Sequence, residues 1–158
     1  MSDLIVSGLI ASSYQAAIAV SGGGSSAVAS LLRVPGASRF VLEASVPYHK
    51  AALRAFLGTE PVSLCCSKVA GEMARIAYDR AMRWSGRESH CVGIACTAAL
   101  QTRRERMGSN RAHLSVVLDR KRYYRLITLP AGAREDQELY LGRELLVYVH
   151  ACLELADG

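Results

Sequence analysis

A glycine-rich segment flanked by serines offers the clearest chemistry in this sequence: Ser21-Gly22-Gly23-Gly24-Ser25-Ser26. It follows a short apolar run, Ala16 to Val20, that is typical of a buried strand, and a helical pattern begins at Ser26. A glycine turn between a strand and a helix lets the backbone approach a ligand and points several N–H groups at an anion or a developing oxyanion. The segment has neither the Gly-Lys-Ser/Thr of a Walker A loop nor the GxGxxG spacing. Two interpretations stay open, a ligand-binding turn and a tight turn with capping serines.

Arginines form a second candidate group, in the polar stretch from Gln101 to Arg111. This stretch has no apolar period, so we expect a loop. Guanidinium groups match phosphate oxygens, which makes Arg103, Arg104 and Arg111 candidates for holding a substrate phosphate. The alternative is a solvated charged loop.

Other reactive side chains give weaker patterns. The five cysteines include no CxxC pair, and the histidines are too far apart for a metal site, so we expect no metal. Cys96 beside Thr97 is a second nucleophile candidate, although a buried cysteine without a matched base is more often inert. Arg120-Lys121-Arg122 with Tyr123 and Tyr124 suits either a nucleic-acid surface or an ordinary turn between strands.

Alternating elements must position these residues. We expect helices at about 3–12, 26–33, 49–57, 67–84 and 135–156, and strands at 16–20, 40–46, 91–96, 113–118 and 123–129. This order predicts a three-layer α/β/α fold with a mixed, mostly parallel sheet and a late antiparallel hairpin. Ligands of such sheets bind where strand ends meet helix starts.

Length and composition set the frame. The chain has 158 residues, 51% of them hydrophobic and 21% charged, with a formal net charge of +5. These values favour one folded domain, residues 1–158. No long apolar run or signal-like N-terminus is present, so we expect a cytosolic protein with no membrane contact. A second apolar strip on the last helix, with Tyr140, Val147 and Tyr148, suggests a homo-oligomer through that helix.

Several motifs together resemble the CinA C-terminal domain family. The resemblance covers about residues 16–117 and consists of motifs in the family's order: Ala19-Val20-Ser21-Gly22-Gly23-Gly24, Val34-Pro35-Gly36-Ala37-Ser38, Tyr48, Gly58, Cys66-Ser67-Lys68-Val69-Ala70-Gly71-Glu72-Met73-Ala74 and Gly93-Ile94-Ala95. The corresponding family patterns are roughly A-E-S-C-T-G-G, V-P-G-A-S, V-x-Y-S-N-E-A-K, L-G-V, V-S-E-E-V-A-x-x-M-A and G-I-A-G-P.

The family includes nicotinamide mononucleotide deamidases, which hydrolyse a carboxamide. The resemblance implies that Ser21 is the nucleophile, that Tyr48 belongs to the site, and that no cofactor is required. The family's assisting lysine is replaced by Leu53, and Lys50, one helical turn away, is the candidate substitute. Lys50 also fits a solvated surface lysine.

Two departures affect the ligand contacts. The family's Gly-Pro becomes Cys96-Thr97, and the arginine-rich stretch follows it. The expected substrate-binding set is therefore Gly22, Gly23, Gly24, Ser25, Thr97, Arg103, Arg104 and Arg111.

Two functions remain. The first is amide hydrolysis of a pyridine nucleotide, and the second is a non-catalytic nucleotide-binding or scaffold protein that kept the glycine loop and lost the base. The expected partner is a small nucleotide ligand, and we do not expect nucleic acid.

Overall fold

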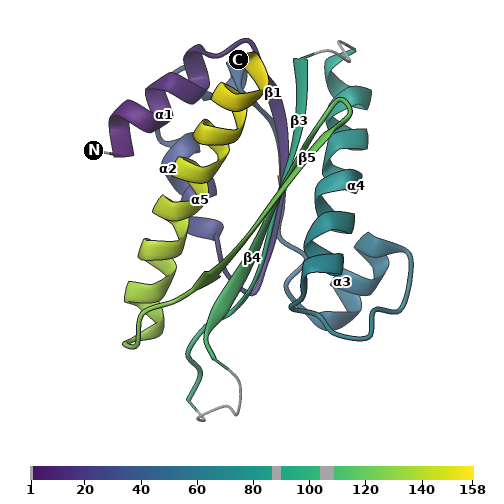
Figure 1. Ribbon diagram of the computed structural model, residues 1–158, viewed down its shortest axis with the longest axis vertical. Helices are drawn as coiled ribbons and strands as arrows, with labels where there is room; N and C mark the ends of the chain where they lie inside the picture. The colour runs from purple at the N-terminus through teal and green to yellow at the C-terminus, as the bar shows by residue number, and fades with distance from the viewer. Residues whose placement is uncertain (1, 87–89, 104–108) are drawn as a thin grey trace.

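The chain folds into three layers, with a five-stranded sheet between two layers of helices (Figure 1). A computed structural model describes residues 2–86, 90–103 and 109–158. In chain order the elements are α1 (Ser2–Ala11), β1 (Gln15–Ser21), α2 (Ser25–Leu32), the 3-10 turn η1 (Ala37–Arg39), β2 (Val41–Ser45), α3 (Lys50–Leu57), α4 (Ser67–Ser85), β3 (Cys91–Ala99), β4 (Arg111–Leu118), β5 (Lys121–Thr128) and α5 (Arg134–Asp157).

The sheet has the order β2-β1-β3-β4-β5. β1 pairs in parallel with β2 and β3, while β4 runs antiparallel to both of its neighbours, β3 and β5. The expected mixed sheet with a late hairpin is therefore confirmed. The hairpin turn is shorter than expected, because β5 begins at Lys121 and only Asp119 and Arg120 connect the strands. A two-residue turn of this kind requires positive φ, and Asp119 has φ of 48°.

Two apolar cores fill the spaces between the layers. Helices α1, α2 and α5 cover one face of the sheet, where Phe40, Leu114 and Leu141 are buried. Helices α3 and α4 cover the other face, where Leu53, Met73 and Val117 are buried. Because all positions of β3 are buried, its nearly continuous apolar sequence identifies it as the central strand.

Glycine allows α5 to pack closely against the start of α2. A Cβ added at Gly142 of α5 would lie 2.0 Å from Oγ of Ser26. Only a residue without a side chain permits this approach, which fixes the distance between the two helices.

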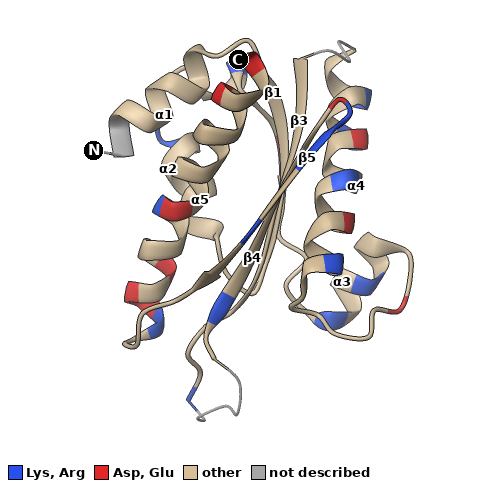
Figure 2. Ribbon diagram, viewed as in Figure 1, with Lys and Arg blue, Asp and Glu red and all other residues tan. Residues whose placement is uncertain are grey.

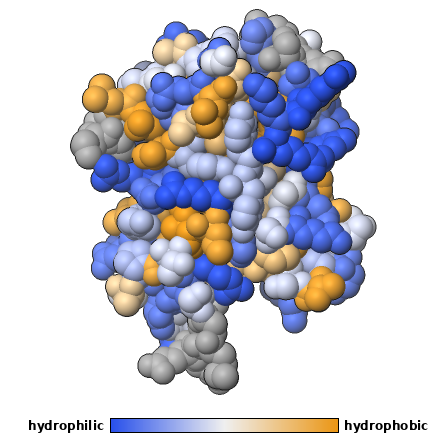
Figure 3. All heavy atoms as spheres, in the orientation of Figure 1, coloured by the Kyte–Doolittle hydropathy of each residue, from blue (hydrophilic) through white to orange (hydrophobic). Residues whose placement is uncertain are grey.

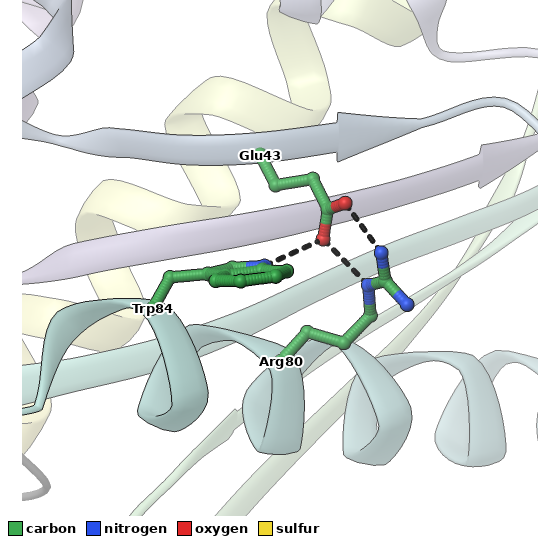
Figure 4. A network of polar contacts seen from close by, with 3 residues as sticks. All are labelled: Glu43, Arg80 and Trp84. Atoms are coloured by element: carbon green, nitrogen blue, oxygen red, sulfur yellow. Dashed lines mark hydrogen bonds and ion pairs between the residues drawn. The ribbon is translucent and has the colours of Figure 1, made fainter.

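A polar cluster joins the edge strand β2 to α4 (Figure 4). The Glu43 carboxylate accepts hydrogen bonds from both Arg80 Nε and Nη2, and from Trp84 Nε1 at 3.2 Å. The hydrogen bonds from Arg80 are the main cause that lowers the pKa of Glu43 below its usual value. The cluster therefore ties the half-buried edge strand β2 to helix α4.

No helix in the described ranges combines the length and apolar character needed to cross a membrane.

Candidate functional site

A row of buried polar side chains crosses the sheet near the carboxyl ends of β1 and β3. Ser21 pairs in register with Thr97, and Thr97 pairs with His113 of β4. All three side chains are buried, on the face of the sheet that α3 and α4 cover. This is the sheet edge at which a ligand was expected.

The Ser21 hydroxyl is committed to the backbone. It is buried and donates a hydrogen bond of 2.9 Å to the carbonyl oxygen of Pro47. This bond fixes the connection between β2 and α3. Within the described ranges, no side chain that is able to act as a base is hydrogen-bonded to Ser21.

Leu53, Lys50 and His49 make no hydrogen bond with the Ser21 hydroxyl within the described ranges. Leu53 is 1% exposed and belongs to the core between the sheet and the helices α3 and α4. Lys50 is exposed at the start of α3 and lines neither cavity beside the glycine loop. His49 caps α3, because its Nδ1 accepts a hydrogen bond of 3.1 Å from the Ala51 N–H.

The glycine loop requires glycine at two positions. Gly22 and Gly24 have φ of 78° and 104°, in the left-handed region that side chains rarely adopt. A Cβ added at Gly22 would also lie 2.1 Å from the carbonyl oxygen of Ala98. The loop thus turns sharply against β3 and leads directly into α2, as expected.

A carboxylate from α5 accepts hydrogen bonds from the backbone N–H groups of this loop. The Glu138 carboxylate accepts hydrogen bonds from the Gly24 N–H at 2.9 Å, from the Ser26 N–H at 3.1 Å, and from the Ser26 hydroxyl at 2.7 Å. The Ser26 hydroxyl also lies 2.9 Å from the Glu138 carbonyl oxygen. A carboxylate at the positive end of a helix is electrostatically favourable. The anion-binding position of the loop is therefore filled by the chain itself.

Arg134, one turn before Glu138 on α5, also donates hydrogen bonds to the glycine loop. Its Nη2 donates to the Gly22 carbonyl oxygen and to the Tyr48 hydroxyl, both at 3.2 Å, and its Nη1 donates to the Gln101 carbonyl oxygen at 3.2 Å. Arg134 therefore connects α5 to the glycine loop, to the β2–α3 connection and to the segment after β3.

Two neighbouring cavities lie against the loop, with volumes of about 530 and 350 Å³. Gly22, Tyr48 and Arg134 line both of them. Tyr48 is 65% exposed, so its ring forms a wall that a ligand can contact. The larger cavity also receives Gly23, Ser25, Glu135 and Glu138, and the smaller one receives Ser21, Cys65 and Thr97.

The expected phosphate-binding arginines lie differently. Arg111 is not in a loop but begins β4, and its guanidinium donates to the carbonyl oxygens of Ser109 and Cys65 at 3.1 and 3.2 Å. Arg103 is exposed and lines neither cavity. Arg104 lies outside the described residues.

The expected ligand contact Thr97 and the second nucleophile candidate Cys96 both have structural roles. The Thr97 hydroxyl donates to the Leu64 carbonyl oxygen at 2.7 Å. Cys96 faces the α5 side of the sheet, where complete burial raises the pKa of its thiol and keeps it protonated.

His113 ends the polar row. Its Nδ1 lies 2.7 Å from the Tyr124 hydroxyl, and its Nε2 is buried without a partner in the described ranges. Burial, followed by the charge of Arg111, lowers the pKa of His113. The described residues contain no group of three side chains suited to hold a metal ion.

Sequence reasoning missed Arg134 and Glu138. Both lie in the first turns of α5, spaced by four residues and therefore on one face of the helix. That spacing was the only available signal, because their partners in the glycine loop are more than 100 residues away.

Solved structures of CinA-superfamily proteins have a similar fold. The competence/damage-inducible protein CihA from Agrobacterium tumefaciens matches with a TM-score of 0.78 and 19% identity, over 94% of this chain and 91% of that one. A competence or damage-inducible protein from Enterobacter asburiae matches with a TM-score of 0.77 and 16% identity, over 96% of this chain and 94% of that one. A CinA-superfamily protein from Escherichia coli matches with a TM-score of 0.74 and 22% identity, over 92% of this chain and 84% of that one.

These similarities confirm the fold that the sequence motifs implied. At identities of 14 to 22% they show the fold alone. No protein-family model and no curated protein sequence matches the chain.

Proposed function

We propose that this chain is a divergent CinA-type domain that binds a small ligand of nucleotide size beside its glycine loop without hydrolysing it. The ligand would lie in the two cavities that share Gly22, Tyr48 and Arg134, with its ring against Tyr48. The observation that carries the proposal is the contact of Glu138 with the loop N–H groups.

Three features support binding without catalysis. Amide hydrolysis by a serine requires a base for the hydroxyl and N–H donors for the oxyanion. The Ser21 hydroxyl donates to Pro47, and Leu53 is buried where the family has its lysine. The amides of Gly24 and Ser26 already donate to a negative carboxylate, which disfavours a second negative charge at the same place.

Purified protein mixed with nicotinamide mononucleotide tests both parts of the proposal. We expect changes in the NMR signals of the Gly22–Gly24 amides and the Tyr48 ring, and no ammonia above the background rate. The Ser21→Ala variant is the control for the second measurement. Ammonia release that Ser21→Ala abolishes would show that the chain is an active amidohydrolase, and the absence of any spectral change would exclude this ligand.

We also propose a homo-oligomer through α5, where Leu139 and Tyr140 are exposed. Light scattering of the wild type and of Leu139→Asp tests it, because a charge in an apolar interface is expected to dissociate the oligomer. A cytosolic location stays a prediction that fractionation can test.

A further inference from the structure

A groove between α4 and β5 lies apart from the glycine loop and has a volume of about 710 Å³, larger than either cavity there. None of its lining residues lines those two cavities. β5 is the edge strand of the sheet, and in the view of Figure 1 it lies in front of the other strands, with α4 to its right. Since most of β5 is exposed, the groove has an uncovered strand as one wall and a helix as the other.

The floor of the groove contains a buried polar group. Ser115 of β4 is 4% exposed, and it lines the groove beside its register partner Tyr124. Within the described ranges its hydroxyl makes no hydrogen bond to another side chain or to the backbone, and it is not among the fully enclosed polar atoms that lack a partner. The hydroxyl therefore faces the open groove, where it can donate a hydrogen bond to a ligand acceptor.

An aromatic surface adjoins this hydroxyl. Tyr124 is 48% exposed, and its ring stacks on His113 with centroids 5.9 Å apart. The hydrogen bond between its hydroxyl and His113 Nδ1 fixes the ring in place. Ile76 and Leu57 complete an apolar wall, so a planar ring has surface to contact in the groove.

The charges around the groove are mainly positive. Lys68, Arg75 and Arg122 line it, against the single lining acid Glu72. Arg75 contacts Asp79 at 3.6 Å, whereas Lys68 and Arg122 have no ion pair within the described ranges. Figure 2 shows basic segments alternating with acidic ones along α4 and a basic segment at the hairpin end of β5, and Figure 3 shows hydrophilic surface on this side of the molecule.

The start of α4 adds to this positive potential. Ser67, the first residue of the helix, lines the groove, and the first turn contains no acidic residue. The N-cap residue Cys66 makes no side-chain cap, so the amides of the first turn remain available as donors.

We propose that the groove binds a small aromatic phosphate, with its ring beside Tyr124 and Ile76 and its phosphate between Lys68 and Arg122. The Ser115 hydroxyl donates to an acceptor on the ligand. The volume lies within the range of ordinary small-molecule sites. This site is independent of the function proposed for the glycine loop.

Phenyl phosphate is the probe, and phenol and inorganic phosphate are its two halves. In NMR titrations of the isotope-labelled protein, we expect phenyl phosphate to shift the amide signals of Ser67, Ser115 and Tyr124 with a Kd of about 1 mM or below. Each half should bind at least about tenfold more weakly, because it uses only part of the groove.

Matched variants test the residues. Lys68→Glu and Arg122→Glu should each weaken phenyl phosphate binding about tenfold, and Ser115→Ala about fivefold. The control is Arg33→Glu, the same charge change at the exposed residue that caps the end of α2, on the opposite side of the sheet. Thermal melting confirms that each variant is folded.

Three results would overturn the proposal. One is equal affinity in Arg122→Glu and Arg33→Glu, which would mean that only net charge matters. Another is that phenyl phosphate shifts only the amide signals of residues 22–26, which would place its binding at the glycine loop. The third is a dimer, seen by light scattering, that Arg122→Glu dissociates, which would assign the groove to contact between copies of the chain.

Discussion

The carboxylate of Glu138 lies 2.9 Å from the backbone nitrogen of Gly24, although 114 residues separate the two in the sequence. The contact places a fixed negative charge where an α/β protein of this kind usually meets a ligand's phosphate or oxyanion. It also replaces the missing side-chain cap of α2, since Gly24 at the N-cap position has none.

Removing this carboxylate should lower stability and create an anion site. We expect Glu138→Ala to lower the free energy of unfolding by about 1–2 kcal/mol, because the loop amides and the Ser26 hydroxyl lose their acceptor. In the same variant, inorganic phosphate should raise the melting temperature by more than it raises that of the wild type. Glu135→Ala, which removes a carboxylate from the same cavity, is the control. It should neither lower the free energy of unfolding nor increase the effect of phosphate on the melting temperature. Equal behaviour of the two variants would contradict the role given to Glu138.

Ser21→Ala should affect stability rather than catalysis. The variant loses the hydrogen bond to Pro47 and leaves a buried carbonyl oxygen without that donor, at a cost of about 1 kcal/mol. Urea unfolding measures this loss against Ser38→Ala, an exposed serine. A measurable amidase activity in the wild type that disappears in Ser21→Ala would reverse this prediction.

Leu53→Lys tests whether only the base is missing. The Leu53 side chain lies in the apolar core and lines neither cavity beside the glycine loop. We therefore expect the variant to lose about 3 kcal/mol of stability without a gain in ammonia release, because a buried ammonium has no partner there. Leu53→Met, which conserves volume, should cost about 1 kcal/mol or less. A stable Leu53→Lys protein that releases ammonia would show that the site is still assembled for hydrolysis.

The Glu43–Arg80 pair should contribute a pH-dependent part of the stability. Because the pKa of Glu43 is lowered in the folded state, its contribution is complete above the unfolded value of about 4.3 and is lost as the pH falls through the folded value. At pH 7 we expect Glu43→Gln to be less stable than the wild type by about 1 kcal/mol, since both side chains are partly exposed and water screens the pair.

Unfolding at several pH values measures this difference, which should shrink below about pH 4. The control is Glu60→Gln, because Glu60 pairs with Arg54 at 2.8 Å on the surface and should contribute only a few tenths of a kcal/mol. A constant difference between the wild type and Glu43→Gln across the pH range would contradict the ion-pair account.

Local patterns predicted the elements well where composition changes abruptly. The apolar run before Gly22 gave β1, and Gly58 and Gly86 end α3 and α4 in the left-handed conformation usual for helix ends. The arginine-rich stretch was harder, because Arg111 is polar in sequence but belongs to a strand whose other residues are buried.

The site was predicted only in part for a physical reason. The glycine loop and Tyr48 come from continuous motifs, so the sequence shows them. The partners that decide the chemistry of the loop, Glu138 and Arg134, reach it through the packing of α5, and a single sequence contains no measure of that contact. The burial of Leu53 likewise depends on how α3 packs against the neighbouring elements.

The close approach of Gly142 to Ser26 has a consequence for how this pocket can diverge. Glu138 lies one turn before Gly142 on the same face of α5, so the spacing between α5 and α2 determines whether the carboxylate reaches the loop amides. A methyl group at position 142 would push the helices apart without touching any ligand. We therefore expect Gly142→Ala to weaken the contact between Glu138 and the loop amides and to change how the loop meets anions, although position 142 lines neither cavity beside the loop.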